Sequence, residues 1–370
     1  MKYIRTVEIY EQVINCEEID ELKEILDKYS PYYSRWRDYI NEIMIKNGLS
    51  YGKLGAICGF SKNTIKSWGT ANKVPKSREA FFRFGMGLRC NIGEMNYILQ
   101  RYGKYPKLYA KSLEDAIAIY EITHYPEDES VNAYDEFQKK KEIFIKYVNQ
   151  KNKRHFLHNS QNATLDMEKV ITELDDDEQF IQFIKENEVE FMNSYYKLLD
   201  YISAFVKAEN MDGSYHSLVK GKELNKGFEK MLSNLRNKGE VPNRDKLIWL
   251  GIVLNMSMSE INKMLEYANM EKLCAKDKIE CVYMFILANL DVSNPYYQID
   301  HAVLVSKYTE NPQIKEQCNN LLEELVGLKN SGEVREDVEY YVKETLKSLE
   351  FDEDDEIVKL FLKNNLQKGE

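Results

Sequence analysis

The stretch that decides the fold, residues 49–88, reads LSYGKLGAICGFSKNTIKSWGTANKVPKSREAFFRFGMGL. Its pattern predicts a short helix over Tyr51 to Cys58, a turn at Gly59-Phe60, and a second helix with Ser61 as its N-cap. A serine hydroxyl suits that position because it accepts a hydrogen bond from a free N–H group of the first helical turn. Glycine readily adopts the positive φ that the turn needs. Two short helices joined in this way are typical of a helix-turn-helix.

The apolar side chains of this stretch give the two helices a reason to pack. Gly55 is small enough to let the helices approach, and Ile65 and Trp68 are spaced to pack back on Leu54 and Ile57. All of these positions are therefore expected in a core.

The order of these residues resembles the Cro/repressor-type (xenobiotic-response-element) helix-turn-helix family. The shared order is a small residue, a glycine four positions on, a branched apolar residue six further, and a large apolar residue three beyond that. The resemblance covers about residues 36–100, including the helix after Pro75 and the turn LRCNIGE at 88–94. It implies a five-helix bundle whose third helix, Ser61 to Gly69, lies in the major groove of DNA.

Two positions depart from the family's usual pattern. The family often has Gln at the first position of the second helix and Glu after the aromatic residue of the third, whereas this chain has Tyr51 and Gly69. The hydroxyl of Tyr51 can still donate to a phosphate, but the usual Gln contact to a base is missing.

The third helix supplies the candidate DNA contacts. By the resemblance, its polar side chains face base edges or phosphates: Ser61, Lys62, Asn63, Thr64, Lys66 and Ser67. Independently of the family, Asn and Lys bond base edges and Lys neutralises phosphate. Flanking cations add attraction that does not depend on base sequence: Arg35, Arg37, Lys73, Lys76 and Arg78. The alternative is a solvated helix face on a helix-turn-helix that serves only for packing.

The charge of the chain is unevenly distributed. Residues 31–111 contain 15 Lys/Arg and 4 Asp/Glu, a net of +11, whereas the rest contains 36 Lys/Arg and 57 Asp/Glu, a net of -21. The overall charge of -10 hides this polarity, which would attract a polyanion to one end of the protein.

A set of landmarks occurs twice, about 166 residues apart. The first set is Val74-Pro75-Lys76-Ser77-Arg78, Glu94-Met95-Asn96 and Lys107-Leu108-Tyr109-Ala110-Lys111. The second set is Val241-Pro242-Asn243-Arg244, Glu260-Ile261-Asn262 and Lys272-Leu273-Cys274-Ala275-Lys276. Recurrence in one order indicates a duplicated module, with the second copy at about 198–276.

The second copy serves as an internal comparison. Where the first has its helix-turn-helix, the second has residues 217–232, in which the small residue and turn glycine are hard to place. Residues 214–276 contain 11 Lys/Arg and 7 Asp/Glu, a net of only +4. The shared landmarks lie outside the recognition helix and therefore indicate scaffold, and the second copy is interpreted as an interaction or pseudo-twofold partner domain.

The composition predicts an all-α fold. The chain has only 17 Gly and 7 Pro in 370 residues, too few turn-forming residues for the many turns of a β fold. Helix-forming residues recur at helical spacing. An amphipathic helix is expected over Glu17 to Lys28. The expected organisation is an N-terminal helical segment (1–30), the helix-turn-helix module (31–123), a helical linker (124–177), the divergent second module (178–290) and an acidic helical C-terminal region (291–370).

No pattern indicates catalysis, a cofactor or a metal. His155 and His158 share a helical spacing but lack a third ligand, and the acidic runs at 175–178 and 352–356 are interpreted as helix starts. The six cysteines contain no C-x-x-C pair and are expected to be reduced and structural. The N-terminus lacks the apolar core of a signal peptide, so a cytoplasmic protein without a membrane partner is expected.

These observations predict a bacterial-type cytoplasmic DNA-binding protein, a transcriptional regulator that binds duplex DNA through its first module. The second module and the C-terminal region would then provide self-association, a protein contact or signal input. Two alternatives remain open: a non-enzymatic adaptor built from two helical docking modules, and an RNA-binding protein that uses the same basic surface.

Overall fold

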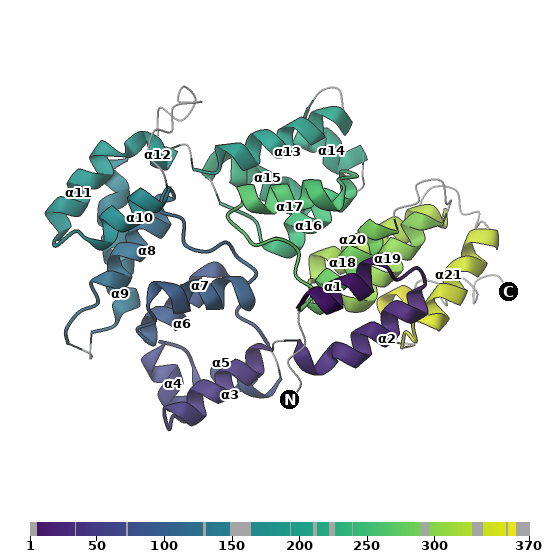
Figure 1. Cartoon of the computed structure of the whole chain (residues 1–370), viewed down its shortest axis with the longest axis horizontal. Helices are drawn as coiled ribbons and strands as arrows, with labels where there is room; N and C mark the ends of the chain where they lie inside the picture. The colour runs from purple at the N-terminus through teal and green to yellow at the C-terminus, as the bar shows by residue number, and fades with distance from the viewer. Residues whose placement is uncertain are drawn as a thin grey trace.

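Every regular element in the described part of the chain is helical, which confirms the all-α prediction (Figure 1). The computed structural model describes residues 6–33, 35–71, 73–128, 131–148, 164–192, 194–209, 213–221, 226–238, 240–289, 296–327, 336–352 and 354–359. The helices bury two hydrophobic cores, one formed within residues 36–191 and the other by residues 9–29 together with 195–357.

The first core is built around five short helices that follow one another along the chain. They are α3 (Trp36–Lys46), α4 (Tyr51–Ile57), α5 (Lys62–Thr70), α6 (Arg78–Gly87) and α7 (Ile92–Arg101). Trp36 is 1% exposed, and its ring lies 5.9 Å from Trp68 and 5.1 Å from Phe84, in edge-on geometry. Aromatic pairs of this kind add to the free energy gained by burying their area.

The same core continues through the next part of the chain. The helices that follow are α8 (Leu113–Thr123), α9 (Ala133–Phe144), η2 (Ile145–Tyr147), α10 (Thr164–Thr172), α11 (Asp177–Glu186) and α12 (Glu188–Met192). Helices α9 and α10, which fall within 124–177, both pack against α8. Tyr120 of α8 stacks on Phe180 of α11 with ring centroids 4.3 Å apart.

The second part of the chain repeats this order of helices. Its elements are α13 (Tyr196–Glu209), α14 (Tyr215–Gly221), α15 (Lys226–Lys238), α16 (Arg244–Val253), α17 (Met258–Tyr267) and α18 (Lys278–Ala288). Helices α16, α17 and α18 correspond to α6, α7 and α8 in the spacing of the repeated landmarks. Gly85 of α6 and Gly251 of α16 show the correspondence in detail, because a Cβ at either would lie within 2.7 Å of a side chain on the following helix, Met95 or Ile261.

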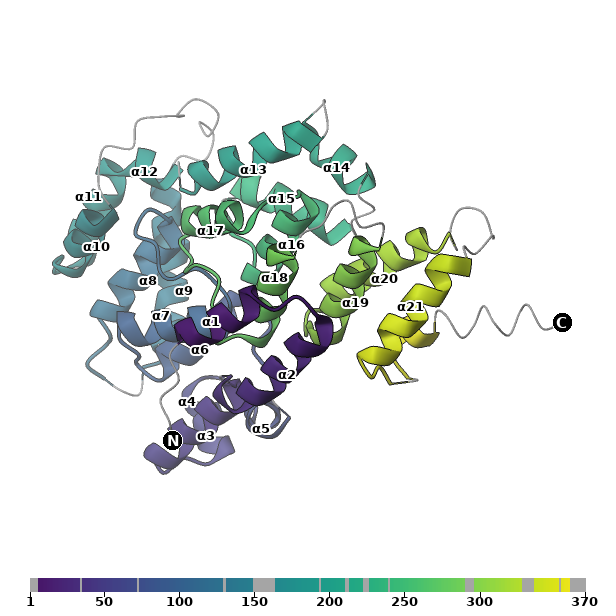
Figure 2. The same cartoon turned by 45° about the vertical axis from the view of Figure 1, so that its right-hand side comes forward.

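The two ends of the chain share the second core. The N-terminal helices α1 (Thr6–Ile14) and α2 (Ile19–Tyr29) both contact α18, and α19 (Tyr297–Tyr308), α20 (Pro312–Leu325) and α21 (Glu336–Ser348) extend the same cluster (Figures 1 and 2). The 3-10 turn η1 (Ser30–Tyr32) follows α2 directly. Leu22 and Leu26 of α2 are fully buried there, so the amphipathic helix expected in this segment is confirmed.

Candidate nucleic-acid interface

Helices α4 and α5 form a helix-turn-helix whose turn depends on two glycines. The backbone N–H of Phe60 donates to the carbonyl of Gly55 at 2.7 Å, and Gly59 has a φ of +68°. A Cβ at Gly55 would lie 2.6 Å from the carbonyl oxygen of Phe60. Both positions therefore require glycine, one for close approach and one for its backbone conformation.

The predicted N-cap of the second helix is confirmed. Ser61 has an extended backbone, and its Oγ accepts from the N–H of Thr64 at 3.1 Å. Its hydroxyl also lies 2.9 Å from the hydroxyl of Thr64, and the hydroxyl of Ser67 donates to the carbonyl of Thr64 at 2.7 Å. The hydroxyl groups of Ser61, Thr64 and Ser67 are thus fixed by hydrogen bonds within α5 and its N-cap.

One packing expectation for this unit is wrong. Leu54 and Cys58 are fully buried on one face of α4, but Ile57 is 43% exposed. Ile57 therefore lies at the edge of the buried face of α4 and is not a core residue.

The outer face of α5 is polar and cationic. Lys62, Asn63 and Lys66 are exposed, and neither lysine forms an ion pair with a residue that the structure describes. Between Glu42 and Arg78 the chain carries no Asp or Glu but has six lysines: Lys46, Lys53, Lys62, Lys66, Lys73 and Lys76. The exposed lysines of α5 attract phosphate, and neither α4 nor α5 carries a carboxylate that would oppose them.

The flanking cations lie at the start of α3 and in the connection between α5 and α6. Arg35 is exposed and precedes α3, whose Trp36 ring contacts Trp68 of α5, and the backbone N–H of Lys73 donates to the carbonyl of Ser67. Lys73 and Lys76 are exposed in the connection to α6. Arg37 is half-buried and its Nε donates to Asp38 at 3.3 Å, so its charge is partly compensated.

Arg78 does not belong to this surface, contrary to expectation. Its guanidinium forms a two-point ion pair with Asp115 of α8, which is fully buried, with Nη2 to Oδ2 at 3.0 Å. Asp115 also accepts from the backbone N–H of Tyr109 at 3.0 Å. A guanidinium held in this way positions the scaffold and is unavailable to a phosphate.

The second copy contains an equivalent buried ion pair. We call the two pairs, Arg78–Asp115 and Arg244–Glu280, the latch of each copy. Arg244 is 6% exposed and binds Glu280 of α18 at two points, Nε to Oε1 at 2.6 Å and Nη2 to Oε2 at 2.9 Å. Glu280 accepts from the backbone N–H of Cys274 at 2.7 Å, as Asp115 does from Tyr109.

The repeated Glu-x-Asn element has the same use in both copies. Asn96 Oδ1 accepts from the backbone N–H of Leu108 at 2.7 Å, and Asn262 Oδ1 accepts from Leu273 at 2.9 Å. Glu94 and Glu260 each complete a capping box at the start of their helix. These contacts explain why the landmarks recur and place them in the scaffold.

The sequence interpretation missed Asp115 and Glu280, the carboxylates of the two latches, although in both copies an acid stands four residues after the shared Ala-Lys.

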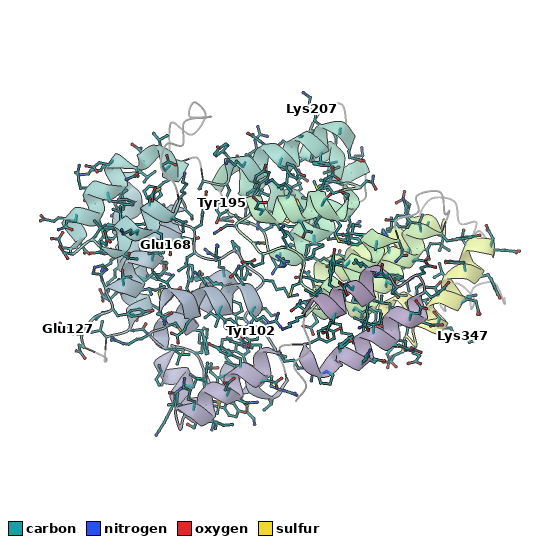
Figure 3. All side chains as sticks on the ribbon, in the orientation of Figure 1. Tyr102, Glu127, Glu168, Tyr195, Lys207 and Lys347 are labelled. Carbon is teal, nitrogen blue, oxygen red and sulfur yellow. The ribbon has the colours of Figure 1, made fainter. Side chains whose placement is uncertain are left out.

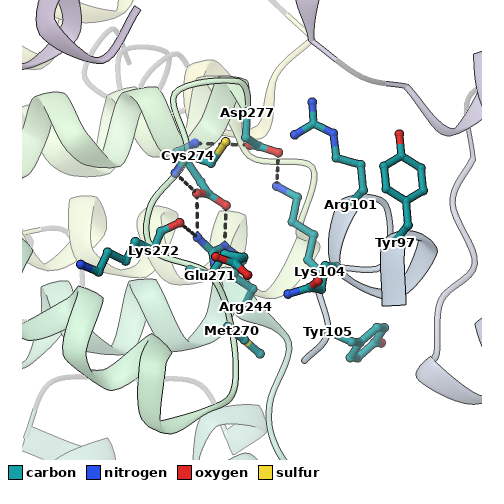
Figure 4. Close-up of a pocket in the computed structure, with 12 residues that line it drawn as sticks. Tyr97, Arg101, Lys104, Tyr105, Arg244, Met270, Glu271, Lys272, Cys274 and Asp277 are labelled. Atoms are coloured by element: carbon teal, nitrogen blue, oxygen red, sulfur yellow. Dashed lines mark hydrogen bonds and ion pairs between the residues drawn. The ribbon is translucent and has the colours of Figure 1, made fainter. Parts of the chain in front are cut away.

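The two copies contact each other where Lys104 of the first copy forms ion pairs with two carboxylates of the second (Figure 4). Lys104 follows α7, and its ammonium lies 2.6 Å from Asp277 and 3.5 Å from Asp245, the residues at the starts of α18 and α16. The backbone N–H of Arg244 donates to the carbonyl of Lys104 at 2.8 Å. Burial disfavours the ammonium, but the two carboxylates outweigh it and raise the pKa of Lys104, which stays charged. The cavity of about 230 Å³ beside it is lined by Arg101, Lys104 and Arg244, which already have carbonyl or carboxylate partners, and by the exposed Lys272.

A second contact joins the copies on the other side of this junction. The rings of Tyr109 and Tyr195 lie 4.8 Å apart, and Tyr195, labelled in Figure 3, immediately precedes α13. Asn269 Nδ2 donates to the carbonyl of Lys107 at 3.3 Å. The repeated loops of the two copies are therefore packed directly on one another.

In the second copy, helices α14 and α15 occupy the position that α4 and α5 have in the first. Helices α14 and α15 pack together, but a Cβ at Gly221 would meet nothing within 4 Å, in contrast to Gly55. Helix α15 carries Glu229, whose carboxylate lies 3.4 Å from His216, whereas α4 and α5 carry no acid. The corresponding helices of the second copy therefore differ from the first in lacking this close approach at a glycine and in carrying an acid.

The other candidate features have local explanations where the structure describes them. Asp176 caps α11 by accepting from the N–H of Gln179, Asp354 pairs with Lys359, and Asp355 pairs with Lys315. His155 and His158 lie outside the described residues. Within the described ranges no group of three His, Cys, Asp or Glu side chains could hold a metal ion, all six cysteines are free, and no helix is long and apolar enough to cross a membrane.

No protein-family model, curated protein or solved structure matches the chain. The assignment of a function therefore depends on the geometry and charge of the site itself.

Proposed function

We propose that the protein binds duplex DNA through the first module and acts as a transcriptional regulator. The observation that supports this most directly is the conjunction of a helix-turn-helix with an acid-free, cationic outer face on α5. Lys62, Asn63 and Lys66 carry the side-chain types that read base edges and neutralise phosphate.

The contacts divide by role. Lys62, Asn63 and Lys66 enter the major groove from the N-terminal half of α5, where the helix dipole also favours phosphate. Arg35, Lys73 and Lys76, at the start of α3 and in the connection after α5, hold the phosphate backbone. The hydroxyls of Ser61, Thr64 and Ser67 order the helix and accept further bonds. Tyr51 at the start of α4 packs its ring beside Gly69 of α5, and we assign its hydroxyl to a phosphate at this edge of the surface.

The rest of the chain supplies the regulatory part. Outside residues 31–111 the net charge is -21, which repels DNA and leaves those surfaces for self-association, a protein partner or signal input. The second copy keeps the buried Arg–carboxylate pair and the capping box, but its α14 and α15 lack the close approach seen at Gly55 and carry an acid, so we assign it to contacts within the protein or with a partner.

Selection of bound sequences from random duplex DNA by the full chain tests this function. An enriched motif whose complex resists competition by structured RNA is the expected result. Preferential retention of RNA would instead assign the surface to RNA. Failure to retain either, together with a stoichiometric protein partner that survives nuclease treatment, would favour the adaptor.

A further inference from the structure

A groove of about 420 Å³ lies between the end of α10, the turn that follows it and the exposed side of α11. Its apolar lining comes from Val170, Leu174 and Phe183. Helix α10 packs against α8 and buries Met167 and Ile171 in the first core, yet Val170 on the same helix is 42% exposed. Both helices lie at the edge of the molecule farthest from α21, so the groove is accessible (Figures 1 and 2).

Polar side chains of α11 form one rim of this groove. Glu178, Gln182 and Glu186 line it, are exposed and follow one another at intervals of four residues, so they stand in one row along the helix. The two carboxylates are about 12 Å apart along the helix axis at a rise of about 1.5 Å per residue. Neither Glu178 nor Glu186 forms an ion pair with a residue that the structure describes. The rim therefore offers two uncompensated negative charges at a fixed spacing.

The surroundings of the groove are also acidic. Residues 164–192 contain 10 Asp/Glu and 2 Lys/Arg, a net of -8. Two of these acids pair with cations from elsewhere in the chain, because Asp177 lies 3.5 Å from Lys140 and Glu190 lies 2.9 Å from Lys111. The remaining charge attracts a cationic partner and repels a polyanion such as nucleic acid.

An apolar lining beside an acidic rim matches the two faces of a basic amphipathic helix. Such a helix places its apolar side chains in a groove at positions i, i+3, i+4 and i+7. Its cations seven or eight positions apart would be about 10–12 Å apart, the spacing of Glu178 and Glu186. Exposed ion pairs contribute little affinity, but they select the partner and fix its register. The contacts with Val170 and Leu174 would then supply most of the affinity.

We propose that the groove between α10 and α11 is a docking site for a basic amphipathic helix of a partner protein. The apolar face of that helix covers Val170 and Leu174, and its lysines or arginines meet Glu178 and Glu186. The site is separate from α5 and does not depend on the proposed DNA binding.

Two fluorescent peptides of about four helical turns are suitable probes, since they share one shape and differ in charge. One contains Leu on one face and Lys on the other, and the second has Glu in place of every Lys. Fluorescence anisotropy with the full chain at low salt should show saturable binding of the basic peptide and at least about tenfold weaker binding of the acidic one. Lys62→Ala/Lys66→Ala should bind the basic peptide like the unmodified protein, so a failure of DNA binding would not affect this result.

Val170→Asp distinguishes docking in the groove from general attraction between charges. It makes the protein more acidic, so charge alone would strengthen binding of the basic peptide. A carboxylate on the apolar lining should instead weaken it at least about tenfold. Leu165→Asp is the matched control, because it adds the same charge to the same helix at a residue that is 79% exposed and outside the groove. It should stay within about twofold of the unmodified protein.

Glu178→Gln/Glu186→Gln tests the rim. It should weaken the basic peptide about three- to tenfold and make its salt dependence shallower. Circular dichroism checks that each variant is folded, and the rim variant carries the test if Val170→Asp does not fold.

The proposal is overturned if the basic peptide does not bind, if the acidic peptide binds as well, or if Val170→Asp binds like the unmodified protein. Two other occupants of the groove would overturn it as well. A dimer in sedimentation that Val170→Asp dissociates and Leu165→Asp does not would assign the groove to a second copy of the chain. A gain in peptide affinity of at least about tenfold in Phe156→Ser/Leu157→Ser would assign it to residues 149–163 of this chain.

Discussion

The ring of Tyr51 occupies the space beside the α-carbon of Gly69. A Cβ at residue 69 would lie 2.7 Å from Cε1 and 3.0 Å from the hydroxyl oxygen of Tyr51. The side chain of Asn41 crosses the same place, and its Nδ2 donates to the carbonyl of Gly69 at 3.2 Å. Tyr51 and Gly69, the two positions that depart from the repressor-type pattern, are therefore structurally linked. A large residue at 51 is compatible with a helix-turn-helix because residue 69 has no side chain.

A double-mutant cycle on this pair should show strong coupling. In a helix Ala is favoured over Gly by about 1 kcal/mol, so Gly69→Ala should stabilise a Tyr51→Ala background. With Tyr51 present the new Cβ must displace the ring, and the same substitution should lose at least that gain. Chemical denaturation of the four proteins measures the difference, which we expect to be about 1–2 kcal/mol. Equal effects of Gly69→Ala in both backgrounds would contradict the packing described for Tyr51.

Two glycines on one helix make a second test of the turn. Gly55→Ala places a Cβ 2.6 Å from the carbonyl oxygen of Phe60, and we expect it to destabilise the protein by about 1–3 kcal/mol. Gly52→Ala on the same helix meets nothing closer than 3.9 Å and should be neutral or stabilising. Thermal unfolding monitored by circular dichroism distinguishes them, and similar midpoints would argue against the close crossing of α4 and α5.

Local signals in the sequence were sufficient for the turn and its cap. Gly55, Gly59 and Ser61 are determined by steric limits and by hydrogen bonding within a few residues, so their roles could be predicted and are confirmed. The outward orientation of Ile57 was missed, because a seven-residue helix has too few apolar positions to define which one faces the core.

Contacts between distant segments could not be predicted in the same way. The periodicity of α2 predicted an apolar face but not that α18 would cover it, since an apolar stripe does not specify its partner. The duplicated Arg was visible, but its partner is Asp115 in one copy and Glu280 in the other, which hides the repeat of the latch.

The latch should be important for stability and not only for local geometry. Arg244→Ala leaves Glu280 buried without its partner and removes donors from the carbonyls of Glu271 and Lys272, so we expect a loss of about 3–5 kcal/mol. The exposed pair Lys263–Glu266 provides the control, and Lys263→Ala should change stability by less than about 1 kcal/mol. Urea denaturation compares the two, and a small effect of Arg244→Ala would mean that the ion pair is dispensable.

Burial of His301 should make stability depend on pH in a specific direction. Its pKa is about 3 in the folded protein and about 6.5 in the unfolded chain, so below about pH 6.5 the unfolded state binds a proton that the folded state does not. Stability should therefore fall with decreasing pH, and His301→Gln should remove this contribution. Relative to the variant, the unmodified protein should lose about 2 kcal/mol between pH 7 and pH 5 in urea denaturation.

The neighbouring Asp300 titrates in the opposite sense and is present in both proteins. Burial raises its pKa to about 6, although Tyr341 donates to both of its oxygens. Folding therefore favours its protonated form, and its contribution to stability decreases as the pH rises toward 6. Comparing the unmodified protein with His301→Gln isolates the histidine, and an equal pH dependence of the two would mean that His301 is not buried in its neutral form.

The most direct test of DNA binding compares charge-matched variants of the two copies. Lys62→Ala/Lys66→Ala removes two exposed cations from α5, and Lys220→Ala/Lys230→Ala removes two from α14 and α15 of the full chain. Fluorescence anisotropy on a duplex recovered by selection, or on random duplex at low salt if none is enriched, should show at least about a tenfold loss for the first variant. Its plot of log affinity against log salt should become shallower by about 2, while the second variant stays within about twofold of the unmodified protein. Equal losses for both variants, or no binding of the unmodified protein at low salt, would contradict the assignment of the first module as the DNA-binding part.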